Sequence, residues 1–118
     1  MKLIIAGSRN VPNDKVVERI INRVVGMYDW NVTEVVSGTA RGVDRIGEEW
    51  AEDHNIPVTR FPAEWGRYGK SAGYIRNYAM ASYGDVLLAI WDGESKGTQN
   101  MIELADKNGI KFHVERLR

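Results

Sequence analysis

Asp85-Val86-Leu87-Leu88-Ala89-Ile90-Trp91 is the stretch that decides the fold, and Leu3-Ile4-Ile5-Ala6 has the same character near the start of the chain. Val86 to Trp91 and Leu3 to Ala6 are apolar at successive positions, without the alternation that marks a strand with one solvated face. Strands of this kind are covered by helices on both faces, as in a parallel sheet. Shorter runs rich in β-branched residues predict further strands over 34–36, 57–61 and 110–114.

Four stretches with apolar residues at helical spacing separate these strands, over 13–28, 42–54, 71–83 and 98–107. The third is expected to pack on the sheet through one face, formed by Ile75, Tyr78, Ala79 and Ser82. Strict alternation of strands and helices predicts an α/β fold, a Rossmann-like three-layer αβα sandwich with a mainly parallel five-stranded sheet. We expect residues 1–118 to form a single domain, with an irregular loop over 62–70.

Composition excludes several classes of function. The 16 basic and 16 acidic residues give a net charge of zero, which argues against general nucleic-acid binding and against a membrane-surface protein. The chain has no cysteine and only two histidines, so we expect no metal site. The G-x-G-x-x-G fingerprint is missing after the first strand, and we expect no cofactor. No apolar run approaches the ~20 residues that span a bilayer, so we expect a cytoplasmic protein without a membrane partner.

Polar segments containing glycine follow the first four predicted strands, over 7–9, 37–44, 65–73 and 91–98. Because the carboxyl ends of parallel strands meet at one edge of the sheet, these segments are expected to form a single ligand-binding rim. Gly38-Thr39 and Gly97-Thr98 are expected just before the second and fourth helices, where backbone N–H groups favour phosphate.

The residue types of this rim suit a phosphorylated ligand, because arginine binds phosphate and tryptophan stacks on a base. The expected ligand-binding residues are Gly7, Ser8, Arg9, Ser37, Gly38, Thr39, Arg41, Asp44, Trp65, Lys70, Arg76, Asn77, Trp91, Gly97 and Thr98. Some have a purely structural alternative: Thr98 suits a helix N-cap, and Asp44 suits the positive end of a helix dipole. Met80 and Met101 are expected in the core.

Together the motifs resemble the YspA-type, YpsA-related branch of the SLOG superfamily, which also includes the LOG phosphoribohydrolases and the Smf/DprA proteins. The resemblance runs from Leu3 to about Val114 and rests on Gly7-Ser8-Arg9, Ser37-Gly38-Thr39-Ala40-Arg41-Gly42-Val43-Asp44, Arg76-Asn77 and the segment 91–98. It implies that residues 1–118 form a single SLOG-like nucleotide-binding domain, with a Rossmann-like sheet and a rim that binds nucleotides or nucleotide-derived ligands. It also implies occurrence in bacteria and their phages, and it supports a homo-oligomer.

Comparison with the LOG branch leaves catalysis open. Arg76-Asn77-Tyr78-Ala79-Met80 is similar to its arginine motif, but Met101 stands where that branch has a glutamate important in catalysis. Hydrolysis would need another carboxylate, and the catalytic candidates are Asp44 and Asp92, with Glu94 as a third.

Three functions follow as hypotheses. We expect binding or sensing of a nucleotide or nucleotide-derived phosphorylated ligand at the rim. The alternative is a nucleotide-processing enzyme that performs phosphoribohydrolase-like N-glycosidic hydrolysis. The second alternative is DprA-like binding of single-stranded nucleic acid through residues 60–76, against which the zero net charge argues.

Overall fold

The computed structural model describes residues 1–117. Its five strands form one sheet in the order β3-β2-β1-β4-β5, and every neighbouring pair is parallel. The strands are β1 (Lys2–Gly7), β2 (Glu34–Ser37), β3 (Val58–Arg60), β4 (Val86–Trp91) and β5 (Lys111–Arg116). The predicted α/β, Rossmann-like fold is therefore confirmed, and the sheet is wholly parallel within these residues.

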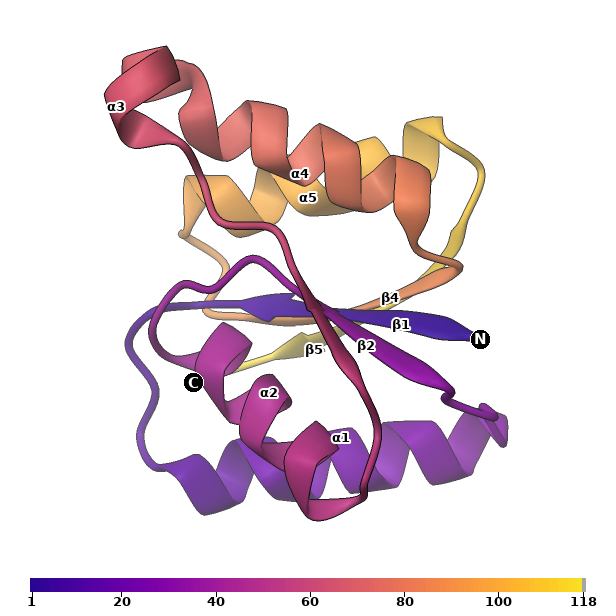
Figure 1. Cartoon of the computed structure of the whole chain (residues 1–118). Coiled ribbons are helices and arrows are strands. Elements are labelled where there is room, and N and C mark those ends of the chain that lie inside the picture. The colour runs from indigo at the N-terminus through magenta and orange to yellow at the C-terminus, as the bar shows by residue number, and fades with distance from the viewer. Residues whose placement is uncertain (118) are drawn as a thin grey trace.

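Helices cover both faces of this sheet (Figure 1). Helices α1 (Asp14–Tyr28) and α2 (Val43–Asp53) lie on one face, and α4 (Ala72–Tyr83) and α5 (Lys96–Lys107) lie on the other. The short helix α3 (Trp65–Tyr68) and the 3₁₀ turn η1 (Gly69–Ser71) precede α4.

Two hydrophobic clusters explain why the central strands are apolar at every position. Leu3 and Ile5 of β1 pack with α1 and α2 on one face, whereas Ile4 and Ala6 pack with α4 and α5 on the other. Since successive strand residues point to opposite faces, a strand between two helix layers needs apolar side chains throughout.

The packing face predicted for 71–83 is wrong. In α4 the buried residues are Ala72, Asn77, Met80 and Ala81, whereas Ile75 and Tyr78 are 42% and 60% exposed. The reason is steric and polar: alanines let α4 approach its neighbours closely, and the Asn77 side chain is buried because it hydrogen-bonds to α5. Ile75 and Tyr78 are left on the outer surface, whereas Met80 fills the buried face.

The region 62–70 is also more ordered than predicted, because it contains α3 and the start of η1. A helix of four residues is too short to produce a recognisable apolar repeat, so the pattern of the sequence does not reveal it. This segment stands at the end of the molecule where the parallel strands terminate (Figure 1).

Over residues 1–117, no helix combines the length and the apolar content needed to cross a bilayer. The same residues hold no group of three or more histidine, cysteine, aspartate or glutamate side chains arranged to bind a metal ion.

Candidate functional site

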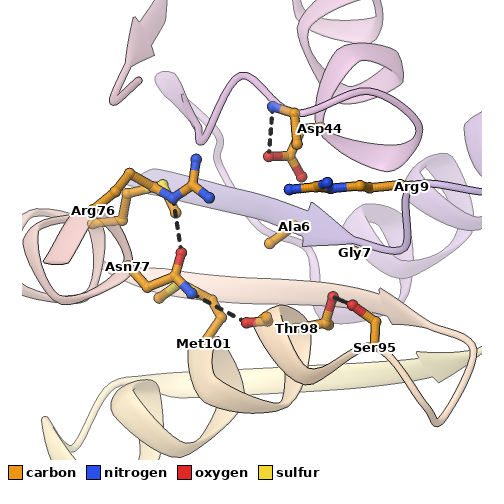
Figure 2. Close-up of a pocket in the computed structure, with 12 residues that line it drawn as sticks. Ala6, Gly7, Arg9, Asp44, Arg76, Asn77, Ser95, Thr98 and Met101 are labelled. Atoms are coloured by element: carbon orange, nitrogen blue, oxygen red, sulfur yellow. Dashed lines mark hydrogen bonds between the residues drawn. The ribbon is translucent and has the colours of Figure 1, made fainter. Parts of the chain in front are cut away.

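A narrow pocket opens at the carboxyl ends of β1 and β4, where the strand order reverses direction along the chain. This is the topological switch point, at which ligands bind in open α/β sheets. We call it the inner pocket (Figure 2). Its volume is about 70 Å³. Its lining residues are Ala6, Gly7, Arg9, Ala40, Asp44, Arg76, Asn77, Met80, Ser95, Gly97, Thr98 and Met101.

Two further hollows adjoin the inner pocket. The outer pocket has a volume of about 440 Å³ and is lined by Arg9, Thr39, Ala40, Arg41, Pro62, Ala63, Trp65 and Arg76. The side pocket has a volume of about 160 Å³ and is lined by Arg9, Trp65, Lys70, Gly73, Tyr74, Arg76, Asn77 and Gly97. Arg9 and Arg76 line all three hollows, so the two guanidinium groups stand where they meet.

Close backbone packing brings β1 and α2 together at this site. Gly42 has a φ of 77°, and a Cβ there would lie 2.4 Å from the carbonyl oxygens of Ser8 and Arg9. Only glycine fits this approach without strain. The amide of Val43 donates a 3.1 Å hydrogen bond to the Ser8 carbonyl, which fixes the start of α2 against the end of β1.

Arg76 is the central cation of the site. Its Nη1 donates to the Gly38 carbonyl oxygen, and its Nε donates to Oδ1 of Asn77 at 2.9 Å. Among residues 1–117, Nη2 has no hydrogen-bond acceptor, which leaves one edge of the fork for a ligand. Burial lowers the pKa of Arg76, the charge of Asp44 raises it and that of Arg9 lowers it again. The guanidinium nevertheless stays protonated, as arginine does in proteins.

Asn77 extends this network to α5. Its Nδ2 donates to the Gly97 carbonyl oxygen at 3.1 Å (Figure 2). The same Nδ2 also donates to Oδ1 of Asn100 at 3.0 Å. The pair Arg76–Asn77 therefore ties the segment after β2 to the N-terminus of α5 through α4.

The N-terminus of α5 faces the inner pocket without a side-chain cap. Ser95 occupies the N-cap position but makes no capping hydrogen bond, and its Oγ lies 3.3 Å from Oγ1 of the buried Thr98. Uncapped N–H groups and the positive end of the helix dipole favour an anion there. Helix α5 begins at Lys96, so Gly97 and Thr98 lie in its first turn rather than before it, which corrects the prediction. The boundary shifts because Asp92 Oδ1 accepts hydrogen bonds from the amides of Glu94 and Ser95, which shortens the preceding loop.

Asp44 is the one acidic side chain that lines the inner pocket. It is 5% exposed, and its Oδ2 accepts a 3.2 Å hydrogen bond from the Ala40 amide. Burial raises its pKa to about 6, although the Ala40 amide, Arg76 and the Gly7 amide each act to lower it. The group therefore ionises close to neutral pH.

The structure brings most of the sequence-predicted residues together. Seven line the inner pocket: Gly7, Arg9, Asp44, Arg76, Asn77, Gly97 and Thr98. Four more line the outer or side pocket: Thr39, Arg41, Trp65 and Lys70. Gly38 and Thr39 do not directly precede α2, because Gly42 is its N-cap.

The remaining predicted residues support the loops instead of lining a hollow. Ser8 Oγ accepts from the Asp92 amide at 2.9 Å, and Ser37 Oγ donates to Glu48 Oε2 at 2.6 Å. Trp91 Nε1 donates to the Ser95 carbonyl oxygen at 3.0 Å, and Gly38 provides the carbonyl that holds Arg76. The catalytic candidates Asp92 and Glu94 also lie outside the linings of the three hollows.

Sequence reasoning missed several lining residues, among them Ala6, Ala40 and Ser95. Ser95 directly precedes the observed helix α5, but the helix was predicted to begin at residue 98, so the sequence did not mark Ser95 as its N-cap. Met80 and Met101 are buried, as predicted, but they also form the floor of the inner pocket.

A larger hollow of about 600 Å³ lies elsewhere on the molecule, lined by Met1, Tyr28, Asp29, Trp30, Asp85, Val86, Ile110, Lys111 and Phe112. It contains none of the predicted site residues. Its lining contains the carboxylates of Asp29 and Asp85 beside Lys111 and the N-terminal residue Met1, and it has no arginine, so it does not match the anion site expected from the sequence. We therefore centre the functional site on the inner pocket.

Comparison with known proteins identifies the family of the chain. The sequence matches the YspA, cpYpsA-related SLOG family over residues 1–68, more than half of its length. It is 42% identical over 82 residues to the Gene 61 protein of Mycobacterium phage D29, a match covering 64% of this chain and 66% of that protein. The chain thus matches just under two thirds of this relative's length. No solved structure matches the chain significantly. The chain belongs to the YspA, cpYpsA-related SLOG family.

Proposed function

We propose that this protein binds a nucleotide or a nucleotide-derived phosphorylated ligand in the inner pocket and the hollows that adjoin it. One observation carries the proposal: Arg9, Arg76 and the uncapped N-terminus of α5 all border the same pocket. Membership of a SLOG family supports a nucleotide-related role.

The dimensions suggest how such a ligand lies. The inner pocket, at about 70 Å³, suits a small group, and a phosphate there meets Arg76 together with the first turn of α5. The outer pocket, at about 440 Å³, falls in the range of small-molecule sites and accepts the larger base. Trp65 is 53% exposed and lines the outer pocket, so its ring offers a surface for stacking.

Isothermal titration calorimetry with a panel of nucleoside mono-, di- and triphosphates tests the proposal. We expect saturable binding of at least one nucleotide and at least tenfold weaker binding by Arg9→Gln, because a cation at the junction of the hollows is lost. The matched control is Arg19→Gln, which changes an exposed arginine on α1. Absence of binding across the panel by the folded protein would overturn the proposal.

A second candidate function is N-glycosidic hydrolysis of a nucleotide. The observation that favours it is the buried Asp44 carboxylate, because its pKa of about 6 suits a group that exchanges a proton near neutral pH. An ionised carboxylate at this position would also stabilise positive charge on the sugar during cleavage.

Chromatographic detection of free base after incubation with nucleoside monophosphates tests this candidate. We expect release of base by the unchanged protein and its loss in Asp44→Asn. Asp92→Asn is the variant for comparison with Asp44→Asn, because Asp92 lies outside the inner pocket. Loss of activity in Asp92→Asn with retention in Asp44→Asn would reject Asp44 as the catalytic group.

A further inference from the structure

The inner pocket joins two chemically opposite parts. One part consists of Arg76 and the N-terminus of α5, which attract negative charge. The other is the carboxyl group of Asp44, which comes from the first turn of α2 in the opposite helix layer. Figure 2 shows Asp44 on the side of the pocket opposite Asn77 and Thr98.

Asp44 is buried without a full set of partners. Its Oδ2 receives the Ala40 amide, and the Gly7 amide also stabilises the charged form. Two carboxylate oxygens offer about four acceptor positions, so acceptor capacity remains unused. In the part of the chain that the structure describes, Asp44 takes part in no ion pair. A buried acceptor in this condition favours a ligand that brings a hydrogen-bond donor.

The donor cannot be a phosphate oxygen, because the phosphate and the Asp44 carboxylate are both anions and repel each other in a site shielded from water. An amino group of a base also fits poorly, because the planar ring that carries it would have to enter with it, and the inner pocket is far smaller than the outer one. The group that remains in a nucleotide is a sugar hydroxyl, which is small, lies near the phosphate and donates a hydrogen bond.

We propose that Asp44 accepts a hydrogen bond from a ribose hydroxyl and thereby selects ribonucleotides over 2′-deoxyribonucleotides. This inference rests on the proposed function, because it specifies the ligand of the same pocket. A site that hydrogen-bonds a ligand hydroxyl discriminates strongly against the analogue that lacks it, because the buried acceptor is then left unpaired.

Paired titrations test the inference. Each of AMP, GMP, CMP and UMP is titrated by calorimetry beside its 2′-deoxy counterpart, and AMP also beside 3′-deoxy-AMP. We expect the ribonucleotide that binds to do so about ten- to a hundredfold more tightly than its deoxy counterpart. Asp44→Asn should reduce that ratio to about threefold or less, since a neutral amide is a weaker acceptor than a carboxylate.

The matched control is Asp53→Asn, the same change at an exposed position of the same helix, which should leave the ratio intact. Asp44→Ser is a second variant that removes the carboxylate and should reduce the ratio in the same way as Asp44→Asn. Far-ultraviolet circular dichroism establishes that each variant is folded. Equal affinity for the ribo and deoxy forms in the unchanged protein would overturn this inference alone. Failure of every nucleotide to bind would overturn the proposed function, and this inference with it.

Discussion

Arg76 on α4 donates a hydrogen bond from Nη1 to the carbonyl oxygen of Gly38, the residue that follows β2. These residues are 38 positions apart in the chain, yet the bond holds the guanidinium at the mouth of the inner pocket. A charged group that is already held in place loses less conformational entropy when a ligand arrives. The contact therefore prepares the site before any ligand is present.

Replacing Arg76 by lysine should weaken both the ligand site and the fold. Lysine keeps the charge but cannot reproduce the planar fork that reaches Gly38 and Asn77 together. We expect at least tenfold weaker nucleotide binding and a free energy of unfolding lower by about 1–2 kcal/mol. Calorimetry and urea denaturation measure the two effects, with Arg19→Lys as control. An unchanged affinity would contradict the role given to the fork.

Gly38→Ala should damage the site more than the fold. A Cβ at this position would lie 2.7 Å from Nη1 of Arg76 and 2.8 Å from Oδ2 of Asp44. Both are side-chain ends, so they can move aside, and the sheet need not change. We expect nucleotide affinity to fall at least tenfold while the free energy of unfolding changes by less than about 1–2 kcal/mol. Titration of the same nucleotide panel, beside thermal unfolding, separates the two outcomes; a large loss of stability with normal affinity would refute the account.

Gly26→Ala should stabilise the protein without affecting the site. Gly26 lies in the last turns of α1, and a Cβ there has no atom within 4 Å. Alanine favours a helix over glycine by about 0.5–1 kcal/mol, and the substitution meets no steric cost. Chemical denaturation should show a gain of that size. A loss of stability would mean that the backbone at this position needs the freedom of glycine.

Asp44 should make stability depend on pH in the direction opposite to most acidic groups. Its pKa is raised from 3.8 to about 6 by burial, so between these values the folded state binds more protons than the unfolded state. The contribution of Asp44 is therefore most favourable below pH 4, falls as the pH rises through 6 and is unfavourable by on the order of 3 kcal/mol above it.

The difference in stability between the unchanged protein and Asp44→Asn isolates this effect from other carboxylates. Glu34 and Glu115, whose pKa values are lowered mainly by side-chain hydrogen bonds, oppose it in the total. Urea denaturation at pH 4 and pH 7.5 should show that Asp44→Asn gains stability relative to the unchanged protein as the pH rises. A constant difference would show that Asp44 does not titrate in this range.

The sheet was predictable from the sequence because its signal is strong and local. Leu3 to Ala6 and Val86 to Trp91 are apolar without interruption, and this pattern occurs where helices cover both faces. The packing face of α4 was not predictable from apolar spacing, because its burial depends on the small side chain of Ala81 and on the hydrogen bonds of Asn77. The groups that these two side chains contact lie on α5 and in the sheet, so the spacing within the helix does not reveal them.

The position of the site was predictable for a topological reason, since parallel strands end at one edge and the polar segments follow their ends. The roles of single residues were less accessible. Ser8, Ser37 and Trp91 lie in the expected segments, but their polar atoms hydrogen-bond to Asp92, Glu48 and Ser95. Which of several neighbouring polar side chains lines a pocket depends on loop conformation, which residue spacing does not determine.

Ala6, Met80 and Met101 form the floor of the inner pocket and also belong to the hydrophobic cluster beneath α4 and α5. Arg41, Trp65 and Lys70, which surround the entrance, lie outside both clusters. Evolution can therefore change these two parts of the pocket to different extents. New ligand preferences would arise from substitutions around the entrance, because substitutions in the floor would unfold the protein before they changed its ligand selectivity.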